Sequence, residues 1–222
     1  MKSRSDVPSP IATTHLLTMF PTFVWKAELE PNVRDALRLG FEGWLKRAMG
    51  SISIERGQSW QSDHDIHRSE TFGDLALAIG AVARKILAFL KIANAELVIT
   101  GCWANVNGPG AGHPRHSHPN NFLSGAYYLE VPPGADTINF HDPRLQTYVL
   151  RPPVTELTRE NADQTVVQVE SGTLLLFPSW LEHSVHPNPI DQARISMSFN
   201  LMFARYAETL SPPLWEGGKR TS

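Results

Sequence analysis

Apolar residues recur along the chain with two different periods, and the change of period divides the sequence into two parts. Over residues 33–48 and 72–90 they return every three or four positions, which predicts two helices with one apolar face each. Further along, short β-rich runs are separated by Pro, Gly and Asn turns, which is typical of a sandwich or barrel. These runs are 97–106, 122–131, 136–141, 165–169, 172–177 and 192–205.

Both predicted helices carry signals at their ends. Asn32 stands where the N-cap of the first helix is expected, and Gly50 stands where the chain would leave it. Thr71 and Asp74 resemble a capping box at the start of the second helix. Because a single apolar face must be covered, each helix should lie against a broad surface, and we expect that surface to be the sheet.

The last β-rich run separates its side chains into an apolar set and a polar set. Successive side chains of a strand point to opposite faces, so the two sets lie on different sides. We expect the helices to cover the apolar side and the polar side to face solvent or a wet cavity. The apolar set is Ile195, Met197, Phe199, Leu201 and Phe203, and the polar set is Arg194, Ser196, Ser198 and Asn200.

Composition excludes several classes of function. The 20 Lys and Arg nearly balance the 22 Asp and Glu, which argues against nucleic acid as a partner. The single cysteine, Cys102, excludes a disulfide framework and a metal site made of cysteines alone. Prolines interrupt the basic N-terminus and no apolar run has the length of a membrane span, so we expect a cytoplasmic protein without a signal peptide. Histidine is the exception, because six of the nine fall between His113 and His186.

Two histidines separated by one residue, His116 and His118, indicate a metal site. On a strand, residues two apart project from the same face, so both imidazoles can reach one point. Imidazole suits iron, zinc, copper and nickel. His183 follows an apolar run at the start of a later strand, and Arg194 comes eleven residues after it. A solvated loop would explain the first pair alone, but the order of three histidines and a basic residue is far more specific.

This order resembles that of the double-stranded β-helix oxygenases that use Fe(II) and 2-oxoglutarate, in particular a small bacterial and phage family. The stretches that carry the resemblance are HSHPNNFLSGAYYLEVPP, FHDPR, GTLLLFPSWLEHSV and RISMSFN. It implies one α+β domain built on a jelly-roll barrel over residues 96–205, with the N-terminal helices on the outer face of the larger sheet. Residues 15–95 would supply an extended segment and these helices, and residues 206–222 an irregular tail.

The resemblance also implies roles for individual residues. His116 matches the first histidine ligand of the family, His183 matches the distal one, and Arg194 matches the basic residue that binds the far carboxylate of 2-oxoglutarate. Ser196 extends this match, and Tyr128 matches a tyrosine that helps to hold the cosubstrate. Fe(II) would be the metal and 2-oxoglutarate the cosubstrate. From its position alone, Asn105 can point into the barrel and contact the cosubstrate, or it can cap a turn.

The sequence departs from the family pattern at His118, where relatives carry an aspartate. Either three histidines hold the metal, or a carboxylate arrives from elsewhere, for which Asp142 and Glu182 are candidates. Asp142 can also pair locally with Arg144. We favour three histidines, because His118 has the right spacing. A neutral third ligand would leave more positive charge at the iron, which would alter its reduction potential and its affinity for an anionic cosubstrate.

The implied function is an Fe(II)- and 2-oxoglutarate-dependent oxygenase that hydroxylates a small-molecule or peptide substrate. Two alternatives stay open: a cupin-like three-histidine metalloenzyme that does not use 2-oxoglutarate, and a non-catalytic ligand-binding jelly roll. We expect His113, His141 and His186 to be supporting or surface residues, and His64 and His67 to lie in a solvated loop rather than in a second metal site. The last strand or the N-terminal extended segment could pair between the subunits of a homodimer.

Overall fold

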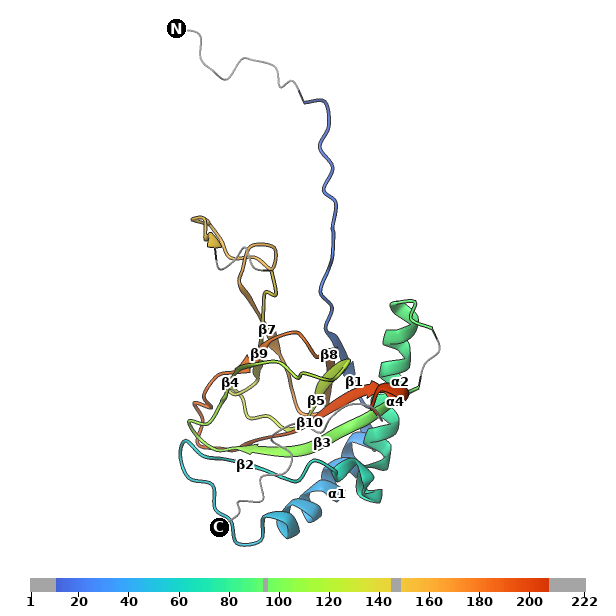
Figure 1. Ribbon diagram of the computed structural model, residues 1–222. Helices are drawn as coiled ribbons and strands as arrows, with labels where there is room; N and C mark the ends of the chain where they lie inside the picture. Colours follow the sequence, from blue (N-terminus) through green and yellow to red (C-terminus); the bar gives the residue numbers. More distant parts are fainter. Residues whose placement is uncertain (1–10, 94–95, 145–148, 208–222) are drawn as a thin grey trace, which may run out of the picture.

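Two antiparallel sheets form the centre of the fold (Figure 1). The computed structural model describes residues 11–93, 96–144 and 149–207. The larger sheet, in spatial order, contains β1 (Trp25–Glu28), β8 (Thr173–Pro178), β5 (Leu123–Glu130), β10 (Arg194–Phe203), β3 (Leu97–Asn107) and β2 (Ser59–Gln61). The smaller sheet, in spatial order, contains β4 (His113–His116), β9 (His183–Val185), β6 (Thr137–His141) and β7 (Gln164–Gln168).

The predicted α+β jelly roll is confirmed in its architecture. From β3 to β10 the chain crosses repeatedly between the two sheets, so strands distant in sequence become neighbours. The six predicted β-rich runs correspond to β3, β5, β6, β7, β8 and β10. The sheets face each other without closing into a continuous barrel: among the described residues, no ladder joins an edge of one sheet to an edge of the other.

Two helices cover one face of the larger sheet, α1 (Pro31–Met49) and α2 (Gly73–Phe89) (Figure 1). Their buried side chains share one apolar core with alternate residues of β3, β5, β8 and β10. The residues between these alternate positions, such as Tyr128 and Phe177, belong to a second core with Ile138 and Phe140 of the smaller sheet. The helices therefore lie on the outer face of the larger sheet, and its inner face looks toward the smaller sheet.

The predicted start of the first helix is wrong by two residues. α1 begins at Pro31, its N-cap is Glu30, and no side chain caps it, so Asn32 lies within the first turn. Proline suits the first helical position, because it lacks the N–H that a cap would have to satisfy. Gly50 follows the helix with a φ of 56°, which agrees with the predicted end.

The predicted capping box of the second helix is also wrong. α2 begins at Gly73, and its N-cap is Phe72, without a side-chain hydrogen bond. Thr71 lies inside a short 3-10 helix, η3 (Glu70–Phe72), which follows another, η2 (Ile66–Arg68). A 3-10 turn already bonds the backbone groups that a capping side chain would bond, so the signal at Asp74 is not used.

The N-terminal part contributes strands to the larger sheet as well as helices. β1 pairs with β8, with Trp25 opposite Leu176, and β2 pairs with β3, with Trp60 opposite Val106. The sequence predicted an extended segment that contains β1 but no strand at β2. At the other end, β10 leads into the short helix α4 (Ala204–Ala207), and residues 208–222 of the predicted tail lie outside the described residues. Among the described residues, no helix combines the length and hydropathy that crossing a bilayer requires.

Candidate metal centre

Three histidine side chains meet at one point between the sheets. One ring nitrogen from each of His116, His118 and His183 lies within 4.8 Å of the others. His116 ends β4 directly opposite His183, which begins β9. His118 lies two residues beyond β4, where its backbone N–H donates to the carbonyl oxygen of Ser179 at 2.9 Å. The structure thus brings together the three residues that the sequence predicted as a cluster.

Backbone carbonyls orient two of the three imidazoles. His183 Nδ1 lies 3.0 Å from the carbonyl oxygen of Leu181, and His116 Nδ1 lies 2.7 Å from that of Pro114. A carbonyl oxygen only accepts, so both Nδ1 atoms donate and both Nε2 atoms keep a free lone pair. His118 Nε2 and His183 Nε2 are 3.4 Å apart. Histidines that bind metals are normally fixed in this way through their second nitrogen.

Burial keeps two of these imidazoles neutral. Desolvation, together with the neighbouring His183 and His116, lowers the pKa of His118 to about 3. Desolvation also lowers the pKa of His183 to about 4, although the hydrogen bond to Leu181 opposes this shift. The neutral form is the one that binds a metal, so at neutral pH these ligands need not lose a proton first.

Arg194 is a buried cation on the inner face of the larger sheet. It is 4% exposed, and its guanidinium carbon lies 5.0 Å from the centroid of the Tyr128 ring. Nη2 donates to the carbonyl oxygen of Thr137 at 3.3 Å, while the buried Nε has no hydrogen-bond partner. No carboxylate in the described part of the chain pairs with Arg194. An unpaired buried charge is costly, so the site favours an anion supplied from outside.

A cavity of about 180 Å³ leads to this arginine. Its walls come from both sheets and from the loops beside them, and they include Asn107, Thr137, Val185, Asn188 and Arg194. Val185 follows His183 by two residues on β9. The cavity therefore gives a small anion access to the guanidinium on the side of the fold that also carries the histidine cluster.

The other predicted cosubstrate residues also lie on this inner face. Asn105 is 3% exposed within β3, so its proposed turn-capping role is wrong. Its Oδ1 accepts from Gln61 Nε2 at 2.8 Å, and its Nδ2 donates to Ser198 Oγ at 2.9 Å. Ser196 stands between Asn105 and Tyr128 in the register of the sheet. The predicted polar side of β10 thus faces the interior between the sheets.

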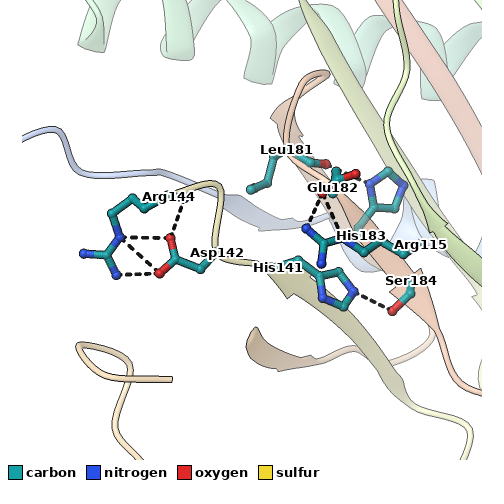
Figure 2. A network of polar contacts seen from close by, with 8 residues as sticks. All are labelled: Arg115, His141, Asp142, Arg144, Leu181, Glu182, His183 and Ser184. Atoms are coloured by element: carbon teal, nitrogen blue, oxygen red, sulfur yellow. Dashed lines mark hydrogen bonds and ion pairs between the residues drawn. The ribbon is translucent and has the colours of Figure 1, made fainter. Parts of the chain in front are cut away.

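The two alternative carboxylate ligands are engaged elsewhere (Figure 2). Asp142 Oδ2 accepts from Arg144 Nη2 at 2.7 Å, and this hydrogen bond lowers the pKa of Asp142. Glu182 accepts from Arg115 Nε at 2.8 Å. Neither carboxylate belongs to the cluster that holds the three ring nitrogens.

Three of the remaining histidines contact other side chains. His113 Nε2 lies 3.3 Å from Asn107 Oδ1, and burial lowers the pKa of His113 to about 4. His141 Nε2 lies 2.9 Å from Ser184 Oγ. His64 stacks on Trp103 at a ring distance of 4.5 Å, and the described residues show no second metal cluster around it.

Three residues that support the site were not predicted from the sequence: Gln61, Trp103 and Arg115. The Trp103 ring lies 6.2 Å from that of His118. Arg115 could have been recognised from the sequence, because it directly precedes the predicted ligand His116, just as Glu182 directly precedes the predicted ligand His183. Gln61 and Trp103 reach the site only through sheet pairing, which leaves no local signal.

Comparisons with known proteins agree with this geometry. Residues 101–200 match the sequence profile of the family described as "Putative 2OG-Fe(II) oxygenase". No curated protein matches the chain. Among solved structures, a Pseudomonas putida prolyl-4-hydroxylase is similar, with a TM-score of 0.58 and 16% identity over 82% of this chain and 93% of that one.

Two further solved structures share the fold. One is the alpha ketoglutarate-dependent epimerase SnoN from nogalamycin biosynthesis, with a TM-score of 0.60 and 14% identity over 82% of this chain and 79% of that one. The other is HygX from Streptomyces hygroscopicus, solved with nickel and 2-oxoglutarate. Its TM-score is 0.56, and its identity is 15% over 82% of this chain and 84% of that one.

The fold and the site together define a jelly-roll protein with a cluster of three histidines that could hold a metal and with a buried arginine. The matched region contains all four of these residues. The match agrees with the resemblance found in the sequence: residues 101–200 are similar to the family of 2-oxoglutarate–Fe(II) oxygenases.

Proposed function

We propose that the protein is an Fe(II)- and 2-oxoglutarate-dependent oxygenase that hydroxylates a small-molecule or peptide substrate. In this proposal His116, His118 and His183 hold the iron, and Arg194 binds the far carboxylate of 2-oxoglutarate. The observation that carries it is the buried guanidinium of Arg194, which has no carboxylate partner among the described residues. A cupin-like three-histidine enzyme without 2-oxoglutarate would leave this guanidinium unexplained.

The donor set fits an iron ion. The cluster offers three imidazole nitrogens within 4.8 Å of one another, and imidazole is a suitable ligand for iron. Three protein ligands leave coordination positions open. When bound, Fe(II) would supply the oxidising chemistry, in which 2-oxoglutarate and dioxygen are consumed and a C–H bond of the substrate is hydroxylated. The chain itself holds the ligands and keeps their surroundings apolar, with Phe140 and Phe177 close to His183.

The surroundings of Arg194 suit a carboxylate. A guanidinium can bind both oxygens of a carboxylate with two parallel hydrogen bonds. The Tyr128 ring lies below the guanidinium, and the Thr137 carbonyl holds Nη2, so the direction of the group is set before a ligand arrives. Ser196 and Asn105 line the same inner face and would contact the cosubstrate along its length.

The test is an anaerobic titration of the Fe(II)-loaded protein with 2-oxoglutarate, followed by its metal-to-ligand charge-transfer band. We expect the band with wild type, a dissociation constant raised about 100-fold in Arg194→Met with metal binding retained, and loss of both metal and band in His183→Ala. Absence of any band with fully loaded wild-type protein would contradict the proposal. It would favour the three-histidine enzyme without 2-oxoglutarate, while absence of metal binding would favour the non-catalytic jelly roll.

A cytoplasmic location, the absence of nucleic-acid and membrane partners and the homodimer stay predictions of the sequence. The division of the single domain into residues 15–95, 96–205 and 206–222 also stays a prediction.

A further inference from the structure

The two histidines that face each other across β4 and β9 repeat one local arrangement. His116 Nδ1 donates to the carbonyl oxygen of Pro114, and His183 Nδ1 donates to that of Leu181. Each imidazole is thus oriented by the backbone two residues before it. One residue lies between each histidine and its carbonyl, and any shift of that residue moves both the imidazole and the group that orients it.

These intervening residues, Arg115 and Glu182, form an ion pair with each other (Figure 2). Arg115 Nε donates to Glu182 Oε2 at 2.8 Å, and Nη2 donates to the same oxygen. Arg115 precedes His116 in β4 and Glu182 lies directly before β9, and both side chains reach solvent, whereas His183 is buried at 5% exposure, so the pair lies on the outer side of the cluster. The two side chains are 33% and 44% exposed, so the pair adds little to global stability.

The ladder between β4 and β9 is short, and backbone hydrogen bonds extend it on both sides, from His118 N–H to the Ser179 carbonyl and from Asn188 N–H to the Ala111 carbonyl. Only two pairs of Cα partners join the two strands, one of which is His116 with His183, and the register shifts between the two pairs. On its other side, β9 is joined to β6 by two Cα pairs and by the hydrogen bond of 2.9 Å between His141 and Ser184 (Figure 2). Among the described residues, the ion pair is a side-chain link that ties β4 to this arrangement on the outer face.

We propose that Arg115 and Glu182 are positioning residues of the metal centre. Their ion pair holds the two carbonyl-bearing segments at a constant separation and thereby sets the directions in which His116 and His183 present their Nε2 atoms. This inference rests on the proposed metal site and assigns neither residue a contact with metal or substrate. Groups that orient metal ligands typically change metal affinity by about 10- to 100-fold when removed.

The test compares Co(II) binding by the full chain in wild type, Arg115→Met, Glu182→Gln and the exchanged double variant Arg115→Glu with Glu182→Arg. We expect each single variant to bind Co(II) about 10-fold more weakly and to change the d–d absorption band, which reports ligand geometry. The exchanged variant should recover most of the affinity and the wild-type band. Melting temperatures of the metal-free proteins should stay within about 4 °C of wild type.

A purely electrostatic role predicts a different pattern. Arg115 repels a cation and Glu182 attracts one, so Arg115→Met would then tighten Co(II) binding and Glu182→Gln would weaken it. That pattern would overturn the proposal, and so would single variants whose affinities stay within about twofold of wild type. A folded exchanged variant that recovers neither affinity nor band would overturn it as well.

Arg144→Met is the matched control, because it removes an ion pair of the same kind, with Asp142, away from the cluster (Figure 2). It should leave Co(II) affinity and spectrum unchanged. The proposed function is tested separately, by adding 2-oxoglutarate to Fe(II)-loaded wild type. A wild-type chain that binds Co(II) without any response to 2-oxoglutarate would contradict the proposed function, while the comparison of the Co(II) affinities would still decide the positioning role.

Discussion

At the scale of single residues, His118 separates this chain from the aspartate pattern that its sequence resembles. Its backbone is held by Ser179, its imidazole lies beside His183, and burial lowers its pKa to about 3. A centre of three neutral imidazoles carries one negative charge fewer than a centre of two imidazoles and a carboxylate. We therefore expect these two kinds of centre to differ in the charge at the metal more than in the direction of the ligands.

Replacing His118 by Asp tests this charge effect. The added carboxylate should lower the Fe(III)/Fe(II) reduction potential and weaken the binding of 2-oxoglutarate by about 10-fold, since an anion would meet less positive charge. An anaerobic redox titration and a 2-oxoglutarate titration measure the two effects. His118→Gln, which keeps a neutral residue, is the control. A raised potential in His118→Asp would contradict the expectation.

Cys102 shows how burial alone sets reactivity. The thiol is 1% exposed within β3, and desolvation raises its pKa to about 12. Because the thiolate is the reactive form, we expect no labelling by iodoacetamide at pH 8 in the folded protein and complete labelling after denaturation. Mass spectrometry of the intact chain measures both. Rapid labelling of the folded protein would contradict the burial of this strand.

At the scale of elements, periodicity in the sequence predicted the long helices and strands and missed the short strand β2. The alternation in β10 correctly separated a side that packs against the helices, with Met197, Phe199 and Leu201, from a polar side that faces inward. β2 has three residues, which is too few to show a period of two. Helix ends were misplaced because Pro31 and the 3-10 turn before α2 satisfy the first turns without side-chain caps.

The contact between β5, β8 and β10 depends on a glycine. A Cβ at Gly125 would collide with the Leu175 carbonyl oxygen and the Phe199 ring. We expect Gly125→Ala to lower the free energy of unfolding by about 1–3 kcal/mol, as overpacking does. Gly43→Ala, at a helical site whose nearest atom is the flexible end of Arg47, should be neutral or stabilising by up to about 1 kcal/mol. Urea unfolding measures both, and equal effects would contradict this account of Gly125.

At the scale of the whole molecule, the candidate metal centre joins distant parts of the chain. His116 and His118 belong to the segment around β4, whereas His183 begins β9. A metal held by all three would bind the folded chain and not the unfolded one. The site is therefore coupled to the stability of the smaller sheet as well as to chemistry.

Metal addition should accordingly raise the melting temperature. At a free metal concentration about 100 times the dissociation constant, the stabilisation is about 2.7 kcal/mol, which corresponds to roughly 5–10 °C for a chain of this size. Differential scanning calorimetry with Co(II) and with a chelator measures it. The shift should vanish in His183→Ala, and a shift that persists there would contradict the three-histidine site.

The sequence by itself predicted the helices, the long strands, the separation of β10 into an apolar and a polar side, and the grouping of the three histidines, while the resemblance to a family supplied the role expected of Arg194. These features depend on local periodicity and on which residue types can bind a metal or an anion. The tertiary structure alone decided that Asp142 and Glu182 pair with arginines, and that Arg115 lies behind the cluster opposite Glu182. Such pairings join segments far apart in the chain, and their register is set by how the sheets pack, which no local pattern records.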